Sequence, residues 1–194
     1  MGNSLSETLA KSCGVSDSLT ACVCADPDQL DPDLDAVMPK FYVNNAVLSS
    51  EVVLSVQRSW NKIMHGTSMN YIYLKSTDGF HYTDAIDWFG QTFFITLFEQ
   101  YPSMIPLFHI HIVEISKMFV LKFDSIVNLL EDPEQCLITL ETLARTHSQY
   151  GVHAIQYGIF GDVFMLTLRN TLKSDYTDYT HSSWIKVIYV CSRL

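Results

Sequence analysis

Apolar residues recur every three or four positions along most of this chain, and this spacing is the feature that most restricts its fold. Two runs show it clearly: Val53, Val56, Trp60 and Ile63, then Ile86, Phe89, Phe93 and Leu97. Residues spaced in this way share one face of an α-helix. No segment shows the strict alternation typical of a half-buried strand. We therefore expect an all-α fold made of amphipathic helices.

Four later stripes continue the pattern toward the end of the chain. They are Ile115, Phe119, Lys122 or Phe123, Ile126 and Leu130; Cys136, Leu140, Leu143 and His147; Ile155, Ile159, Val163 and Leu166; and Trp184, Ile188 and Cys191. The segment Met64–Tyr82 interrupts the pattern with two glycines and several polar residues. We expect a long loop there.

Capping residues indicate where several helices begin and end. Ser49 precedes the first stripe, and Pro102 is suited to the first turn of a short helix. Asp132 followed by Pro133 is a strong start signal for the helix that carries His147. Gly151 is placed to end that helix, because glycine readily adopts the left-handed conformation of a helix C-terminus.

The chain changes composition once, near its N-terminal quarter. Residues 1–40 hold seven acidic side chains against Lys11 and Lys40, with steps such as Asp26-Pro27 and no sustained period. Segments of this composition bury too little apolar surface to fold. We expect a disordered arm over residues 1–43 and one folded domain over residues 44–194.

Charge and cysteine content exclude several classes of protein. The formal net charge is −9, so we do not expect nucleic acid as a partner. No apolar run approaches the roughly 18 residues that a membrane span needs. The five cysteines are irregularly spaced in a sequence with no secretion signal, which indicates reduced thiols. These features favour a cytoplasmic location.

His147 lies on the apolar face of its expected helix and not on the face expected to contact solvent. Its ring could donate a hydrogen bond to the carbonyl of Leu143, one turn earlier, as metal-bound imidazoles commonly do toward a neighbouring acceptor. A histidine on such a face is more often a core residue, so both interpretations stay open on the pattern alone. A zinc site would need three or four clustered ligands, and His153 and Cys136 do not have that spacing.

Two motifs in the sequence resemble the globin family. They are YPSMIPLF at Tyr101–Phe108 and LARTHSQYGV at Leu143–Val152, with Trp60 and Trp184 near the two ends of the matching region. Within the family, the chain is most similar to the neuroglobin and globin X type of animal nerve globin. The resemblance implies a three-over-three helical sandwich. The short stretch after Phe108 implies a reduced CD and D region.

The resemblance also assigns roles to single residues. His147 matches the proximal histidine, which binds the iron of haem b. Pro102 matches the proline that begins the C helix, and Gly90 matches the glycine at which the B and E helices cross closely. Phe108 matches the phenylalanine that packs against the haem, and Val152 matches an apolar residue of the FG corner.

An apolar set is expected to sandwich the haem, because haem is a flat apolar disc with two charged propionates. The expected set is Phe94, Phe98, Phe108, Ile115, Phe119 and Val152. The alternative is that these side chains are ordinary core residues, as most aromatic stripes are.

The residue opposite the proximal histidine is not a clear histidine. An ungapped match places Ile115 at the distal position, and a shift of one residue places Glu114 there. His109 and His111 are the nearby histidines. With Ile115 in place the sixth iron position would be open, whereas His111 would give a bis-histidyl iron suited to electron transfer. We favour the open position.

The N-terminal hexapeptide MGNSLS fits the pattern for N-myristoylation of Gly2. A myristoyl chain alone binds membranes only marginally, and the acidic arm offers no polybasic second signal. Palmitate on Cys13, Cys22 or Cys24 could take its place, and the alternative is that these three are unmodified thiols. We therefore expect attachment to the inner face of the plasma membrane.

The resemblance implies reversible binding of oxygen or another diatomic gas. Together with the expected anchor, it favours a sensor or an electron-transfer protein over an enzyme. The alternatives are a nitrite reductase, a nitric oxide dioxygenase, an oxygen carrier, or a globin-like scaffold without haem. No protein partner is predicted.

Overall fold

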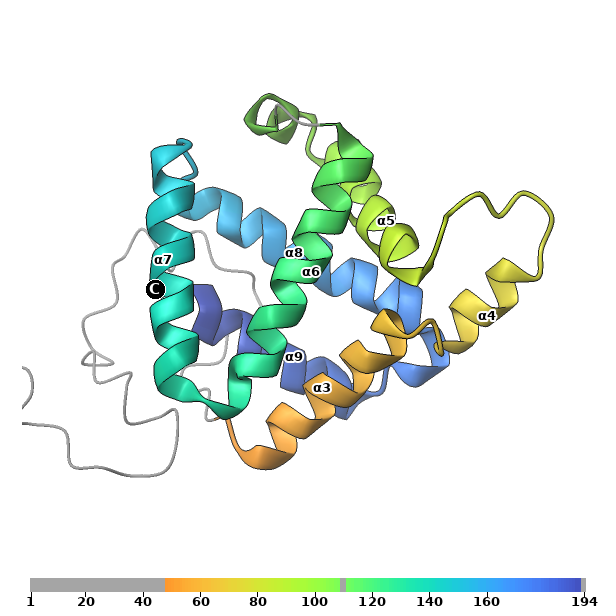
Figure 1. Ribbon diagram of the computed structural model, residues 1–194, viewed down its shortest axis with the longest axis horizontal. Coiled ribbons are helices and arrows are strands. Elements are labelled where there is room, and N and C mark those ends of the chain that lie inside the picture. Colours follow the sequence, from red (N-terminus) through yellow and green to blue (C-terminus); the bar gives the residue numbers. More distant parts are fainter. Residues whose placement is uncertain (1–47, 109–110, 193–194) are drawn as a thin grey trace, which may run out of the picture.

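The computed structural model describes residues 48–108 and 111–192 (Figure 1). Within them lie the following helices: α3 (Ser50–Met64), α4 (Met69–Lys75), α5 (Ala85–Gln100), the 3-10 helix η2 (Pro102–Leu107), α6 (Ile112–Asn128), η3 (Leu129–Glu131), α7 (Pro133–Gln149), α8 (Ala154–Leu172), η4 (Lys173–Asp175) and α9 (Asp178–Ser192). No strand occurs in these residues, so the all-α prediction is confirmed. The predicted arm over residues 1–43 lies outside the described part of the chain.

The helices form two layers. In Figure 1, α3, α6 and α7 lie nearer the viewer, and α8 and α9 cross behind them. Helix α5 packs against both α6 and α8, and α3 packs against α9. Together with α5, the helices α3, α6, α7, α8 and α9 make up the three-over-three sandwich that the sequence resemblance implies.

The predicted caps form the helix ends. The side chain of Ser49 accepts from the backbone N–H of Val52 at 3.4 Å, and that of Asp132 accepts from Gln135 at 3.1 Å. Pro133 is the first residue of α7. Gly151 adopts φ +77° just beyond that helix, a left-handed conformation that favours glycine.

The main core contains both predicted tryptophans. Trp60 of α3 and Trp184 of α9 are almost completely buried and lie 5.9 Å apart between ring centroids. The indole N–H of Trp184 donates to the hydroxyl of Ser59 at 2.9 Å, which joins α3 to α9. Buried indole N–H groups need such partners, so this bond both satisfies Trp184 and fixes the register of the two helices.

Helix α5 crosses α6 at Gly90. A Cβ atom added to this glycine would lie 2.7 Å from the backbone oxygen of Ser116. No larger residue fits without moving the two helices apart. The close crossing predicted at Gly90 is therefore present.

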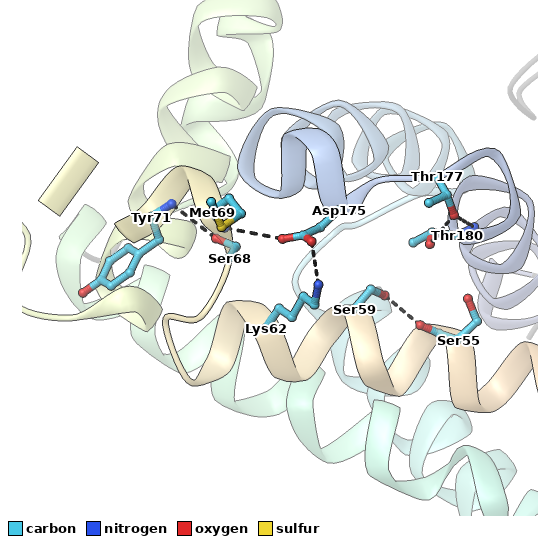
Figure 2. Close-up of polar contacts among 9 residues, drawn as sticks. All are labelled: Ser55, Ser59, Lys62, Ser68, Met69, Tyr71, Asp175, Thr177 and Thr180. Atoms are coloured by element: carbon cyan, nitrogen blue, oxygen red, sulfur yellow. Dashed lines mark hydrogen bonds and ion pairs between the residues drawn. The ribbon is translucent and has the colours of Figure 1, made fainter. Parts of the chain in front are cut away.

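The prediction of one long loop over Met64–Tyr82 is wrong for the middle of this segment, because Met69–Lys75 form helix α4. Ser68 caps α4 through a bond from the backbone N–H of Tyr71. Asp175 then ties the start of α4 to α3, since its carboxylate accepts from Lys62 and from the backbone N–H of Met69 (Figure 2). Of the residues of α4 only Tyr71 is buried, so the helix has no apolar stripe that a sequence pattern could reveal.

The stripe predicted for α8 is correct only in part. Ile155 is 54% exposed, although the period placed it on the buried face. Further along, α8 is buried on most sides, with Val163, Phe164 and Leu168 fully enclosed. A central helix of this kind has no single apolar face, so its period does not show which residues point outward.

The connection between η2 and α6 has the length that the sequence analysis expected. Only residues 108–111 separate η2 from the start of α6, which is the short CD connection predicted. Among residues 48–108 and 111–192, no helix combines the length and apolar character needed to span a bilayer.

Candidate functional site

His147 lies in the last turn of α7 and is half-buried. Its Nδ1 is 2.9 Å from the carbonyl oxygen of Leu143, the acceptor expected from the sequence. A carbonyl only accepts hydrogen bonds, so Nδ1 must carry the ring proton. In the neutral imidazole, Nε2 then holds the free lone pair that a metal ion needs.

The two halves of α7 differ in how they are covered. Cys136 and Leu140, in the first half, are buried in the main core. In the second half, Leu143 and His147 are only half-buried and their neighbours on the helix are mostly exposed. The end of α7 that carries His147 is therefore held less tightly by the described protein than its beginning is.

The four predicted haem-contacting phenylalanines form one group. Phe94 and Phe98 come from α5, Phe108 follows η2, and Phe119 comes from α6. The ring of Phe94 lies 5.3 Å from that of Phe108 and 5.7 Å from that of Phe119, and Phe98 lies 5.5 Å from Phe108 between ring centroids. Phe94 is buried, whereas the other three remain half-buried. We call these four residues the phenylalanine group.

The distal candidates occupy the first turn of α6. Ile115 is half-buried and packs against the main core, one turn before Phe119. His111 is the exposed N-cap of α6, and its Nδ1 accepts from the backbone N–H of Val113 at 3.4 Å. Glu114 is exposed. His109 lies outside the described residues.

Val152 belongs to the corner between α7 and α8. It is half-buried, and its backbone N–H donates to the carbonyl of His147 at 3.1 Å. It is not among the described side chains that pack against the main core. The corner therefore places Val152 next to the backbone of His147 rather than within the phenylalanine group.

Two aromatic residues of α8 near these sites were not predicted. The half-buried ring of Phe160 lies 5.7 Å from that of Phe119, and Tyr157 lies 6.1 Å from His147 between ring centroids. Burial raises the pKa of Tyr157, so its hydroxyl stays protonated near neutral pH. Because α8 is apolar on most sides, the sequence held no signal that set these two residues apart.

The available metal-binding side chains show whether the site is better suited to a zinc ion or to haem iron. Within residues 48–108 and 111–192, no three His, Cys, Asp or Glu side chains are grouped so that they could share a metal ion. A zinc site would need such a group, whereas haem iron is held by a single proximal imidazole and a surrounding apolar pocket. His147 and the half-buried phenylalanine group match the second requirement.

An open depression of about 470 Å³ lies elsewhere on the molecule. It is formed where α3 ends, beside α4 and the start of α5, and includes His65, Tyr71, Lys75 and Asp84. None of the predicted site residues lines it, so it is separate from the region around His147.

Comparisons with known proteins agree with this architecture. The family model described as Globin matches residues 91–193. Among solved structures, a hexacoordinated heme protein from an anhydrobiotic tardigrade, determined at pH 4, has a similar fold, with a TM-score of 0.56 and 16% sequence identity over 75% of this chain and 93% of that one. No curated protein matches the chain significantly by sequence.

The fold is an all-α sandwich that carries His147 in the last turn of α7 and the phenylalanine group on α5, α6 and the residue after η2. Since the family model spans more than half of the sequence, this chain belongs to the globin family. Membership of that family implies haem as the cofactor.

Proposed function

We propose that this globin binds haem b, with Nε2 of His147 as the proximal iron ligand. The observation that carries the proposal is the hydrogen bond from Nδ1 of His147 to the carbonyl of Leu143, 2.9 Å long. It fixes the proton on the nitrogen that faces the helix and leaves the lone pair on the other. It also raises the basicity of the imidazole as a ligand.

The phenylalanine group would cover the faces of the cofactor. Phe98, Phe108 and Phe119 are only half-buried in the described chain, so each still has apolar surface to remove from water. Completing that burial contributes on the order of 1 kcal/mol per ring. The same rings would exclude water from the site.

When bound, haem supplies an iron centre that takes up oxygen or another diatomic gas. We propose that the distal side of this centre is lined by Ile115 and holds no protein ligand. Ile115 has neither a lone pair nor a hydrogen-bond donor in its side chain. Its half-buried position beside Phe119 supports this assignment.

His111 is poorly prepared to act as a distal ligand. Its Nδ1 accepts a backbone N–H at the start of α6, so in the neutral ring the proton is on Nε2. His147 has the opposite tautomer. To bind iron through Nε2, His111 would have to give up its cap and move its proton, and its side chain would have to leave solvent.

An absorption spectrum of the purified chain, in the ferric and ferrous states, tests the proposal. We expect a Soret band and a five-coordinate ferrous spectrum that carbon monoxide converts rapidly. The tardigrade protein is described as hexacoordinated, so the two proteins should differ in this measurement. A chain that takes up no haem would refute the proposed function.

The finer assignment follows the sequence resemblance. We propose a globin of the neuroglobin or globin X type that acts in sensing or redox signalling at the inner face of the plasma membrane. The support is the MGNSLS motif, which fits acylation of Gly2, although the acidic segment that follows it supplies no polybasic second signal. Both lie outside the described residues, as does the boundary proposed between an arm over residues 1–43 and a globin domain over residues 44–194.

A further inference from the structure

Tyr157 is the aromatic residue whose ring contacts His147 in the described chain. It lies in the first turn of α8, whereas His147 lies in the last turn of α7. The two ring centroids are 6.1 Å apart and the ring planes are inclined by 58°. Both values lie in the range of attractive, non-parallel aromatic pairs.

The corner that joins the two residues is short and closely hydrogen-bonded. The backbone N–H groups of Tyr150 and Val152 both donate to the carbonyl of His147, at 3.0 and 3.1 Å. At the start of α8, the backbone N–H of His153 donates to the side chain of Gln156 at 2.7 Å. The first two bonds hold the corner as far as Val152 against the end of α7, and the third caps α8 from the next residue, His153, so the backbone on both sides of the corner is ordered where it leads to Tyr157.

The hydrogen bond to Leu143 does not by itself fix the imidazole plane. Rotation of a histidine ring about its Cβ–Cγ bond has broad minima, and the ring can tilt while Nδ1 keeps its acceptor. A second contact on the ring removes that freedom. Tyr157 is the side chain that the described structure places there.

We propose that Tyr157 is a positioning residue for His147, whose ring limits the rotation of the imidazole and so sets the direction of the Nε2 lone pair. The proposal rests on the proposed function, in which that lone pair binds iron. It concerns the ring of Tyr157 and not its hydroxyl. Tyr157→Phe should therefore behave like the parent, and Tyr157→Leu should not.

Two measurements on the full-length chain test this. In the haem-loaded ferrous protein, resonance Raman spectroscopy reports the iron–imidazole stretching band. In the haem-free protein, the His147 ring signal in a ¹H–¹³C NMR spectrum, assigned by its loss in His147→Ala, reports the order of the ring. We expect Tyr157→Leu to shift and broaden the Raman band and to broaden or split the NMR signal, while Tyr157→Phe changes neither.

Tyr150→Leu is the matched control. Tyr150 is a tyrosine of the same corner, is 76% exposed, and makes no ring contact with His147 in the described chain. It should leave both signals unchanged. The proposal is wrong if Tyr157→Leu matches the parent in both measurements, or if Tyr157→Phe, which preserves the ring, disturbs them as Tyr157→Leu does. If the parent takes up no haem the proposed function fails, but the NMR comparison still decides the role of Tyr157.

Discussion

At the scale of single residues, His147 differs from His81 and His111 because it combines a proton held on Nδ1 with partial burial. His81 also directs Nδ1 at a backbone carbonyl, that of Gly79 at 3.2 Å, but it is exposed. His111 has Nδ1 as an acceptor. His147 combines a fixed proton with partial burial beside an aromatic residue, and this combination is what a proximal ligand requires.

Replacing His147 by alanine should abolish stable haem binding. Loss of a partner that only orients a metal ligand costs about 10- to 100-fold in metal affinity, so loss of the ligand itself should cost more than about 100-fold. The measurement is a haem titration followed at the Soret band. His81→Ala is the control, because it removes an exposed imidazole with the same Nδ1 bond. A normal titration by His147→Ala would show that another group binds the iron.

Substitutions at the start of α6 should identify the distal side. We expect His111→Ala to leave the ferrous spectrum unchanged and to lower the free energy of unfolding by up to about 1 kcal/mol through loss of a cap. Ile115→His should instead produce sharp, split low-spin bands, because it places an imidazole at the position matched to the distal histidine. Low-spin bands in the parent that disappear in His111→Ala would contradict the open site and support a bis-histidyl iron.

At the scale of helices, the sequence predicted those that bury a continuous apolar stripe. Helices α3 and α7 begin at the expected caps because each start combines a polar side chain with an apolar face behind it. Helix α4 was missed because its apolar residues Met69, Ile72 and Tyr73 are exposed. Its position depends on Asp175, which is far away in sequence.

The sequence likewise predicted only some residues of the candidate site. His147 and the phenylalanine group have local signatures, namely a histidine on an apolar face and aromatic residues at helical spacing. Phe160 and Tyr157 have none, because α8 is enclosed on most sides and carries apolar residues around most of its circumference. Which of its residues face the site depends on how α8 crosses α5 and α6, and that angle is a property of the packed molecule.

The crossing of α5 and α6 gives a sharp stability prediction. Gly90→Ala places a Cβ 2.7 Å from a backbone oxygen and 2.9 Å from the adjoining carbon of Ser116. Since backbone atoms cannot swing aside, we expect a loss of roughly 1–3 kcal/mol in the free energy of unfolding, measured by chemical denaturation.

Gly161→Ala provides the comparison. Gly161 is also buried in a helix, but its added Cβ would meet only one side-chain atom, the Cγ2 methyl of Ile188, at 3.3 Å, and no backbone atom. Alanine is favoured over glycine in helices by about 1 kcal/mol, which offsets the tight contact. Equal losses in the two variants would show that the α5–α6 crossing tolerates a side chain at Gly90.

At the scale of the whole molecule, the chain joins a well-packed helical domain to an N-terminal segment of different chemistry. The described domain has no helix suited to cross a bilayer. The membrane anchor proposed for the chain is an acyl group on Gly2, in the segment outside the described residues.

Gly2→Ala should shift the protein from the membrane fraction to the soluble fraction of cells that contain an active N-myristoyltransferase, because alanine cannot accept the acyl chain. One myristoyl chain binds weakly, so the parent itself should partition between both fractions. Ser6→Ala, which changes the recognition motif but keeps Gly2, should have a smaller effect. Unchanged partitioning of Gly2→Ala would remove the proposed anchor.

The hydrogen bond between Ser59 and Trp184 limits how early the domain can finish folding during synthesis. It joins positions 125 residues apart and fastens α3 to α9. During synthesis at about 5–20 residues per second, α3 waits on the order of ten seconds for this partner. Until then the apolar face that contains Val56 and Trp60 has no α9 to cover it. The nascent chain must be kept from aggregating over that interval, and the domain closes only when its last described helix has been made.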